Sequence, residues 1–311
     1  MIVVCGEALV DIVPNLDDPT RYLASPGGSP ANTAIAAARL GSSVSLMARL
    51  SRDRLGRLLR AHLAANGVDL SAAVTAAEPS SAALVDLRED GGAGYRFLVD
   101  GTADWQWTDD ELRGVPEAAT VLHAGSLGLA LPPGGAAIER LLSSARERCT
   151  ISLDPNVRPE LVPDLDDLRT TMERCVAIAD VVKASADDLA CLYPGRQPVE
   201  SATAWSAAGP ALVVMTDGAR GAVGLTPQGV RASVGSVAAV VVDTIGAGDT
   251  FAGAVLDWLA RAGRLGGRLA PPSEDEVADL LRFASACAAI TCSRPGADPP
   301  WRAELVATGT S

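Results

Sequence analysis

The sequence predicts an α/β fold: a central, mostly parallel sheet flanked by helices on both faces, with a small β-sheet as a lid. Apolar runs of strand length alternate with segments of helical spacing along most of the 311 residues, which is the pattern of βα units. The stretch 80–108 interrupts this alternation with two strand-like runs around a Gly-Gly-Ala-Gly turn, and it therefore predicts an antiparallel hairpin. Glycine turns at 27–28 and 246–248 come directly before two of the predicted helices.

Apolar runs, capping residues and glycines along the chain predict the order of the elements. The apolar runs 2–5 and 9–13 predict the first two strands. After the first glycine turn we expect a helix with Ser29 as N-cap, Pro30 at its first position and Gly41 just beyond its last turn. Further strands are expected at 43–50, 119–123, 150–154, 180–183, 211–216 and 237–242, a hairpin at 222–234, and helices at 54–65, 134–148, 164–178, 186–192, 249–262 and 274–293.

The composition limits the class of protein. Apolar residues make up 48% of the chain, which supports a sizeable core, and the length fits one large domain with an insertion or two modest domains. The net charge of −12 argues against nucleic acid or an anionic membrane as the main partner. The six cysteines form no C-x-x-C pair, and no apolar run approaches the roughly 18 residues of a membrane span. We expect a cytoplasmic protein whose phosphate site, if it has one, is locally positive.

The segment 243–249, Asp-Thr-Ile-Gly-Ala-Gly-Asp, follows the apolar run 237–242 and precedes a stretch of helical spacing. The first N–H groups of a helix have no intrahelical partners, and glycines at 246 and 248 let an anion approach them closely. Asp249 adjoins this anion site, where a base is needed when a phosphoryl group moves to a hydroxyl. The alternative interpretation is an ordinary strand-to-helix turn with an aspartate favoured by the helix dipole.

Three further groups of polar residues follow turns or strands. Asn32 lies in the first turn of the helix after Gly27-Gly28 and offers both a donor and an acceptor to a ligand hydroxyl. The loop 154–158, Asp-Pro-Asn-Val-Arg, follows a strand at the sheet end where open α/β folds bind ligands. The segment 216–221 combines a hydroxyl with two glycines. The alternatives are a polar first turn, a surface Asp–Arg pair and a common hairpin connector, respectively.

Several other chemistries lack the residues that they need. The chain contains no G-x-x-x-x-G-K-[ST] motif, and the late G-x-G-x-x-x-x-G spacing does not fit a dinucleotide fingerprint. The two histidines, His62 and His123, are distant in sequence and have no clustered cysteines near them. A zinc site or a Ser-His-Asp triad is therefore not expected.

Together these segments resemble the ribokinase-like, or PfkB, carbohydrate kinase family over nearly the whole chain. The match is carried by GGSPANTAIAAARLG at 27–41 and DTIGAGDTFAGAV at 243–255. The resemblance implies one ATP-dependent sugar kinase domain over 1–311, with a lid formed by about 12–24 and 80–108. The segments GEALVDIVP, GTADWQWT and GSLGLALPP are similar to those of bacterial fructokinases. A 2-keto-3-deoxygluconate kinase, a nucleoside or ribose kinase of this fold, and a non-catalytic sensor remain alternatives.

The resemblance also implies roles for individual residues. Asp249 is expected to be the catalytic base, with Gly246, Ala247 and Gly248 as the anion hole. The expected sugar contacts are Asp11, Gly28, Asn32, Tyr95, Phe97, Arg158 and Asp249. The expected nucleotide contacts are Ser185, Thr216, Gly218, Gly221 and Ser285.

The expected cofactor is Mg²⁺ with ATP, and K⁺ is a further candidate. The family's Asn-x-x-Glu motif reads Ser185-Ala-Asp-Asp188 here, so the carboxylate expected to bind Mg²⁺ through water is the shorter Asp188. A monovalent cation is expected at Asp243 and the carbonyls of Ile245, Thr291 and Gly296. The aromatic lid hairpin either pairs with a second copy in a homodimer or covers the protein's own sugar site.

Overall fold

The computed structural model describes residues 1–15, 18, 20–87, 93–229 and 231–307, without the side chains of 85–87, 93–95 and 306–307. The described residues form an eight-stranded sheet in the order β14-β13-β12-β11-β10-β9-β1-β4, parallel from β4 to β12 and closed by an antiparallel hairpin. The fold class expected from the sequence is confirmed. The strands are β1 (Ile2–Cys5), β4 (Val44–Met47), β9 (Val121–Gly125), β10 (Thr150–Asp154), β11 (Val181–Ser185), β12 (Leu212–Thr216), β13 (Ala222–Leu225) and β14 (Arg231–Val234).

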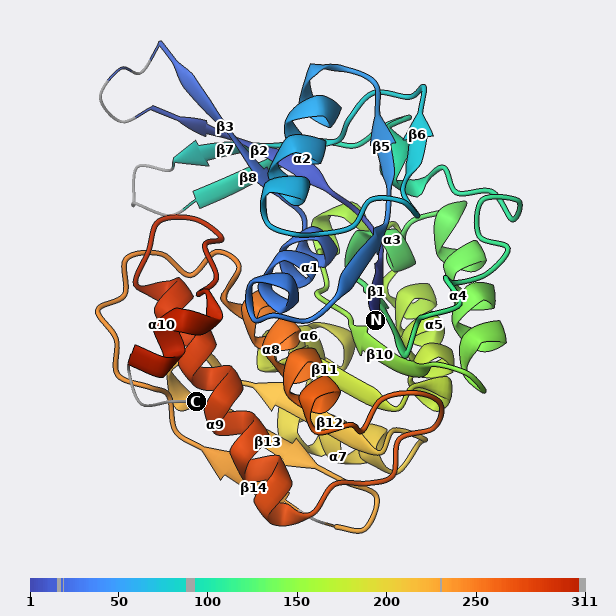
Figure 1. Cartoon of the computed structure of the whole chain (residues 1–311), viewed down its shortest axis with the longest axis vertical. Coiled ribbons are helices and arrows are strands. Elements are labelled where there is room, and N and C mark those ends of the chain that lie inside the picture. Colours follow the sequence, from blue (N-terminus) through green and yellow to red (C-terminus); the bar gives the residue numbers. More distant parts are fainter. Residues whose placement is uncertain (16–17, 19, 88–92, 230, 308–311) are drawn as a thin grey trace.

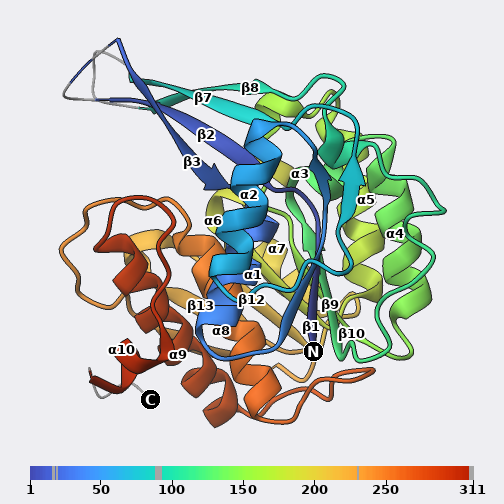
Figure 2. The ribbon, with the colours of Figure 1, turned by 45° about the horizontal axis from the view of Figure 1, so that its top comes forward.

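Helices cover both faces of this sheet (Figures 1 and 2). One face carries α1 (Ser29–Arg39), α8 (Ala247–Arg261) and α9 (Glu274–Cys292), and the other carries α4 (Gly134–Ala145), α5 (Leu165–Ile178), α6 (Ala186–Leu192) and α7 (Pro198–Ser206). Within the described residues, none of the helices is long and apolar enough to cross a membrane. The shorter elements are α2 (Arg54–Ala65), α3 (Ser126–Ala130), α10 (Arg302–Ala307), and the 3₁₀ turns η1 (Ala103–Trp105), η2 (Pro159–Leu161) and η3 (Gly218–Arg220).

A second sheet projects from the carboxyl end of β1, because β2 continues the chain after Gly6. Its order is β3 (Tyr22–Gly27), β2 (Leu9–Pro14), β7 (Ala82–Leu87) and β8 (Ala93–Leu98). The outer pairs are antiparallel and the central β2–β7 pair is parallel. This lid sheet contains the predicted hairpin and lies at the top of Figure 1, apart from the main sheet. A third, two-stranded sheet joins β5 (Arg49–Ser51) and β6 (Val74–Ala76).

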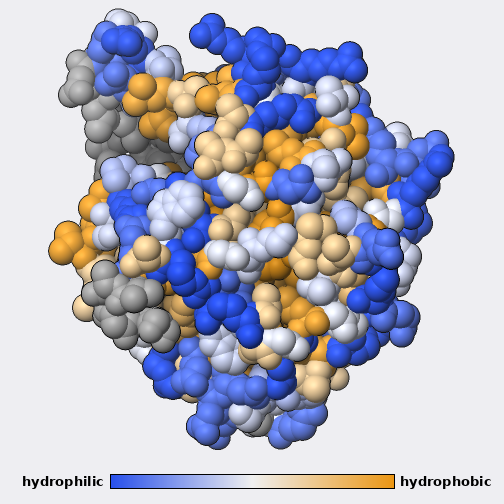
Figure 3. Space-filling model, in the orientation of Figure 1, coloured by the Kyte–Doolittle hydropathy of each residue, from blue (hydrophilic) through white to orange (hydrophobic). Residues whose placement is uncertain are grey.

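The predicted buried strand at 237–242 is wrong. This segment has no strand assignment, and its valines face outward, with Val240 83% and Val241 64% exposed. Its backbone turns back toward α9, because Val242 N–H donates to the carbonyl of Cys292 at 2.8 Å. Figure 3 shows hydrophobic residues at the left margin of the molecule, where Figure 1 draws this part of the chain. The apolar run is therefore not a core strand. Several of its residues line a cavity that is described below.

Other sequence expectations also need correction. Gly28, not Ser29, is the N-cap of α1, and the Ser29 side chain makes no capping bond. The run 43–50 divides into β4 and β5, and α7 had no counterpart in the prediction. Trp105 and Trp107 are buried in hydrophobic clusters beyond the lid sheet, so they do not form part of its surface.

Helices α1 and α8 cross in unusually close contact at Gly253. A Cβ atom added there would lie 2.7 Å from Ala36 Cβ and 2.8 Å from the backbone oxygen of Thr33. Both distances are below van der Waals contact, so a residue with a side chain would force the helices apart. The crossing brings the first turn of α1 next to the first turn of α8, although more than 200 residues separate them.

We predict that Gly253→Ala lowers the free energy of unfolding by about 1–3 kcal/mol, the usual cost of overpacking. Alanine also favours a helix over glycine by about 1 kcal/mol. We expect the overpacking cost to outweigh this gain, because the added methyl group would meet backbone atoms, which cannot move aside as a side chain can. Urea unfolding measures the change. Gly114→Ala is the matched control, because a Cβ atom at Gly114 would meet nothing within 4 Å. Equal stability of Gly253→Ala and the wild type would contradict the packing argument.

Candidate active site

Two cavities of about 490 Å³ each open beside the N-terminus of α8. Thr244 and Gly248 line both of them, so the cavities meet at the turn that leads into the helix. The first, here called the polar cavity, is lined by six charged side chains: Glu7, Asp11, Arg158, Glu160, Lys183 and Asp249. The second, here called the apolar cavity, is lined mainly by alanine, valine, glycine and phenylalanine.

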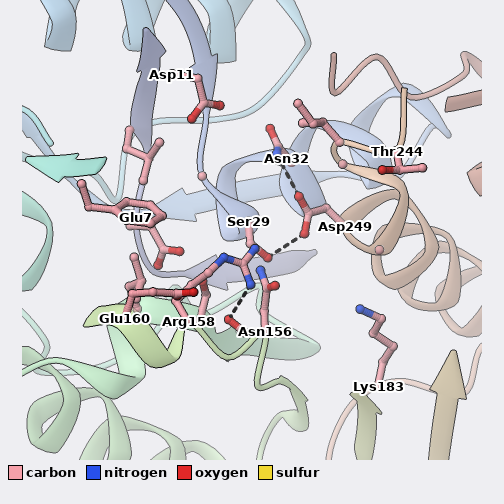
Figure 4. A pocket seen from close by; sticks show the side chains of 18 residues that line it. Glu7, Asp11, Ser29, Asn32, Asn156, Arg158, Glu160, Lys183, Thr244 and Asp249 are labelled. Atoms are coloured by element: carbon pink, nitrogen blue, oxygen red, sulfur yellow. Dashed lines mark hydrogen bonds between the residues drawn. The ribbon is translucent and has the colours of Figure 1, made fainter. Parts of the chain in front are cut away.

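Asp249 projects from the first turn of α8 into the polar cavity (Figure 4). Its Oδ1 accepts a hydrogen bond from Ser29 Oγ at 2.7 Å, and its Oδ2 accepts one from Asn32 Nδ2 at 2.8 Å. Each carboxylate oxygen has two lone-pair positions, so both can still accept a hydrogen bond from a ligand. Ser29, expected only as a helix cap, thus fixes the orientation of this carboxylate.

The turn before α8 brings the first backbone N–H groups of the helix to the place where the cavities meet, and the N–H of Ala247 donates to the carbonyl of Thr244 at 3.3 Å. Gly246 is the N-cap of the helix and adopts a left-handed conformation with φ of 74°, which favours glycine. A Cβ atom at this position would also meet Ala297 Cβ at 2.5 Å. Gly248, in the first helical turn, lines both cavities without a side chain to block them. Since the first N–H groups of a helix lack intrahelical partners, this turn can bind an anion.

The expected sugar contacts mostly surround one space. Asp11, Gly28, Asn32, Phe97 and Arg158 line the polar cavity together with Asp249. The remaining member of that prediction, Tyr95, has its side chain outside the described part of the structure.

Asp11 shares an electrostatic environment with its neighbours in the polar cavity. Burial, helped by the charge of Asp249 and opposed by that of Arg158, raises the pKa of the Asp11 carboxyl to about 6. Arg158 itself donates to the carbonyls of Asn156 and Val157 in its own loop, at 3.3 and 3.0 Å. The cavity therefore combines several hydroxyl-binding acceptors with one guanidinium.

Four of the five expected nucleotide contacts line the apolar cavity. These are Thr216, Gly218, Gly221 and Ser285. The fifth, Ser185, is the N-cap of α6, and its hydroxyl closes a capping box with Asp188. The apolar lining, which includes Phe251 and the 237–241 segment, suits a flat aromatic ligand group.

Asp188 does not fit a direct metal ligand. Its Oδ1 accepts the N–H of Val157 at 2.7 Å, and its Oδ2 accepts the N–H and hydroxyl of Ser185 at 2.8 and 2.6 Å. The carboxylate is buried by these contacts. Among the described residues, no group of three or more His, Cys, Asp or Glu side chains could hold a metal ion.

The four residues expected at a monovalent cation site lie close to the turn. Asp243 Oδ1 accepts the N–H of Ile245 at 3.0 Å, and its Oδ2 accepts the N–H of Gly296 at 2.8 Å. Thr291 is buried below them, with its hydroxyl 2.9 Å from that of Thr250 on α8. Asp243 thus links the turn before α8 to the segment after α9.

Three charged residues of the polar cavity, Glu7, Glu160 and Lys183, had no expected role. Glu7 follows β1 and accepts the N–H of Gly128 at 3.0 Å, and burial raises the pKa of its carboxyl to about 7. Lys183 on β11 donates to Asp154 Oδ2 at 2.8 Å. Lys183 carried a signal in the sequence, because it is the only lysine of the chain. Glu7 carried none, since a single glutamate after a strand is usually solvated.

Comparison with known proteins assigns a family to this geometry. The model of the pfkB family of carbohydrate kinases matches residues 1–304. A fructokinase of Rhizobium leguminosarum bv. trifolii is 37% identical over 262 residues, covering 82% of this chain and 78% of that protein.

Two solved structures of related kinases share the fold over nearly their whole lengths. Aminoimidazole riboside kinase from Salmonella enterica, complexed with aminoimidazole riboside and an ATP analogue, has a TM-score of 0.84 and 27% identity, covering 100% of this chain and 99% of that one. A fructokinase double mutant from Vibrio cholerae O395, bound to fructose, ADP and potassium ion, has a TM-score of 0.84 and 28% identity, covering 98% and 97%. The chain therefore belongs to the pfkB family of carbohydrate kinases and is an ATP-dependent sugar kinase.

Proposed function

We propose that this kinase transfers the γ-phosphoryl group of ATP to fructose and forms fructose 6-phosphate. The observation that carries the proposal is the pair of cavities that share Thr244 and Gly248, with the Asp249 carboxylate on the polar side of that junction. A sugar in the polar cavity and a nucleotide in the apolar one would meet at this point. The similarity to a curated fructokinase at 37% identity supports fructose as the sugar.

In this mechanism Asp249 acts as the catalytic base. Ser29 and Asn32 hold its two oxygens, so the carboxylate keeps one orientation toward the terminal sugar hydroxyl. It aligns this hydroxyl and accepts its proton as the new P–O bond forms. Asp11, Asn32 and Arg158 bind the other hydroxyls, while Gly28 and Phe97 complete the wall of the sugar site, with Tyr95 proposed beside them.

The turn 246–248 acts as the anion hole. Phosphoryl transfer passes through a loose transition state, so catalysis depends on positioning and on stabilisation of the phosphoryl oxygens. The N–H groups of Ala247 and Gly248 would stabilise these oxygens, and Ala247 would exchange its 3.3 Å hydrogen bond to the Thr244 carbonyl for one to a phosphoryl oxygen. Thr216, Gly218, Gly221 and Ser285 would bind the nucleotide, and Ser185 would act on it indirectly through the capping box.

Kinases of this family use ATP with a divalent metal, and we propose Mg²⁺ for this one. The metal supplies neutralisation of the phosphate charge. We propose that Asp188 contacts this metal through water, because the carboxylate is buried and protein donors already engage both of its oxygens.

We also propose a K⁺ site at Asp243 and the carbonyls of Ile245, Thr291 and Gly296. The Asp243 contacts draw Ile245 and Gly296 together beside the anion hole. A cation there would stabilise the turn at Gly246 and act on turnover without contacting the sugar. The related fructokinase from Vibrio cholerae was crystallised with potassium ion.

One alternative substrate class has an observation in its favour. The Arg158 guanidinium lines the polar cavity and could pair with a carboxylate, which would favour a 2-keto-3-deoxygluconate kinase. A nucleoside kinase would need a stacking surface over the sugar side. Trp105 and Trp107 are buried and line neither cavity in the described structure, so they do not support this alternative.

We propose that the chain works as one kinase domain in which the sheet of β2, β3, β7 and β8 closes over the sugar.

Tyr22 and Leu23 on β3 and Leu98 on β8 are about half exposed, and we propose that a second copy covers them in a homodimer. Light scattering measures the mass in solution. A monomer at the concentration used in assays would contradict the dimer and leave the lid proposal intact.

ADP release with a panel of acceptors tests the substrate. The panel contains fructose, ribose, 2-keto-3-deoxygluconate, adenosine and a hexose phosphate, each with and without KCl at matched ionic strength. We expect the highest kcat/KM with fructose and a higher kcat with K⁺ than with Na⁺. If 2-keto-3-deoxygluconate gave the highest kcat/KM, this acidic sugar and not fructose would be the substrate. Equal rates in the two salts would contradict the K⁺ site.

We predict that Asp249→Asn lowers kcat for the preferred sugar by at least about 10²-fold, the low end of general base catalysis. The amide cannot accept the proton, while its oxygen can still accept one of the two hydrogen bonds that Ser29 and Asn32 donate to Asp249. Steady-state ADP release measures kcat, and circular dichroism checks the fold. Turnover near that of the wild type would rule out Asp249 as the base.

A further inference from the structure

The proposed mechanism makes no use of Lys183. It is the only lysine among the 311 residues, and it lies on β11 with 6% of its surface exposed. Lysine is almost never buried to this extent unless its charge is paired. The buried ammonium of Lys183 therefore requires a partner of opposite charge, and its burial in a cavity wall indicates a functional role.

Asp154 at the end of β10 is that partner. Its Oδ2 accepts the hydrogen bond of Lys183 Nζ at 2.8 Å. Its Oδ1 is also buried and has no hydrogen-bond partner in the described structure. Burial opposes the charged form of Lys183, but the carboxylates of Asp154, Asp188 and Asp249 outweigh this effect and raise the pKa of the ammonium. Lys183 is thus a buried cation, with Asp154 holding it in place.

The ammonium adjoins the turn that both cavities share. A Cβ atom added to Gly248 would lie 3.0 Å from Lys183 Nζ, so the amine lies beside this glycine in the space that a side chain would fill. Figure 4 shows the side chain reaching from β11 toward the cavity. An ammonium has three donors, and its hydrogen bond to Asp154 uses one of them. The other two can reach a group bound at the turn.

The junction of the cavities needs positive charge, because the chain has a net charge of −12 and ATP is an anion. Among the described residues, the basic side chains that line either cavity are Lys183 and Arg158. The Arg158 guanidinium is engaged with carbonyls of its own loop. Lys183 is the one of the two that lies beside Gly248 of the shared turn, and it adds a full charge to the partial charges of the helix N-terminus.

We propose that Lys183 is a further catalytic residue, whose ammonium binds the phosphoryl group as it passes between the two cavities, and that Asp154 positions it. The proposal rests on the proposed function, because it assigns a role within that reaction. The bond from the γ-phosphorus to its bridging oxygen breaks, and its electron pair leaves with ADP. The sugar oxygen forms the new bond and its proton passes to Asp249, while Lys183 stabilises charge and transfers no proton.

The single lysine allows a direct binding test. Protein grown with ¹³C,¹⁵N-lysine gives one side-chain signal in NMR spectra, and its loss in Lys183→Met confirms the assignment. We expect this signal to shift when the non-hydrolysable ATP analogue AMP-PNP is added with Mg²⁺. AMP, which lacks the β- and γ-phosphates, is the matched control and should leave the signal near its starting position. An unchanged signal at saturating AMP-PNP would overturn the proposal.

Kinetics test the catalytic part of the proposal. We expect Lys183→Met to lower kcat by about 10²–10³-fold, as for the loss of one transition-state donor, with KM for the sugar changed less than about threefold. Asp154→Asn should lower kcat less, and the double variant should match Lys183→Met alone, because the two residues act as one unit. Asp257→Asn is the matched control for a buried, paired carboxylate outside both cavities, and its kcat should stay within about threefold.

The outcomes separate this proposal from the proposed function. A wild type that phosphorylates none of the panel sugars would contradict the function, while the AMP-PNP titration would still report on Lys183. An active wild type together with a Lys183→Met kcat within about threefold would overturn the role of Lys183 alone. Additive losses in the double variant would overturn the role of Asp154. Where Lys183→Met fails to fold, the titration of the wild type decides.

Discussion

The close crossing of α1 and α8 is the constraint on which the site depends. Only glycine at position 253 allows the backbone of α1 to approach at Thr33 and Ala36. Because the helices touch there, their first turns meet, and Ser29 and Asn32 reach both oxygens of Asp249. A carboxylate with two fixed donors has one orientation, which is the geometric requirement for a base that must meet a single hydroxyl.

The electrostatics of the site follow from its division into two cavities. The polar cavity gathers several carboxylates, and burial raises the pKa of Asp11 to about 6 and of Glu7 to about 7. Such a cavity suits neutral sugar hydroxyls better than phosphate. Apart from Arg158, favourable charge for an anion lies at the junction, where the N-terminus of α8 and Lys183 adjoin Gly248. The chain can therefore be strongly acidic as a whole and still bind ATP in one place.

The apolar run 237–242 fits two structural interpretations, a buried core strand and the wall of a cavity. Six consecutive apolar residues before a glycine turn predict a buried strand, because local patterns contain no information about available partners. In the fold the sheet ends at β14, and the segment meets the C-terminal end of α9 through the hydrogen bond from Val242 to Cys292, with its valines exposed. Part of it lines the apolar cavity, and this wall is the use that we propose for its hydrophobicity.

The sequence by itself determined the βα order, the two glycine turns and most helix bounds, since periodicity and capping are local properties: α2 and α6 begin and end at the predicted residues. It also indicated Asn32, Arg158 and Asp249 through their positions after glycine turns or a strand, whereas Asp11 and Phe97 were expected only from the family resemblance. The tertiary structure alone decided which of these side chains meet. The partnership of Ser29 with Asp249, the pairing of Lys183 with Asp154 and the hydrogen bond from Val157 N–H to Asp188 all join residues from different parts of the chain. These contacts depend on helix crossings and strand order, which no local pattern encodes.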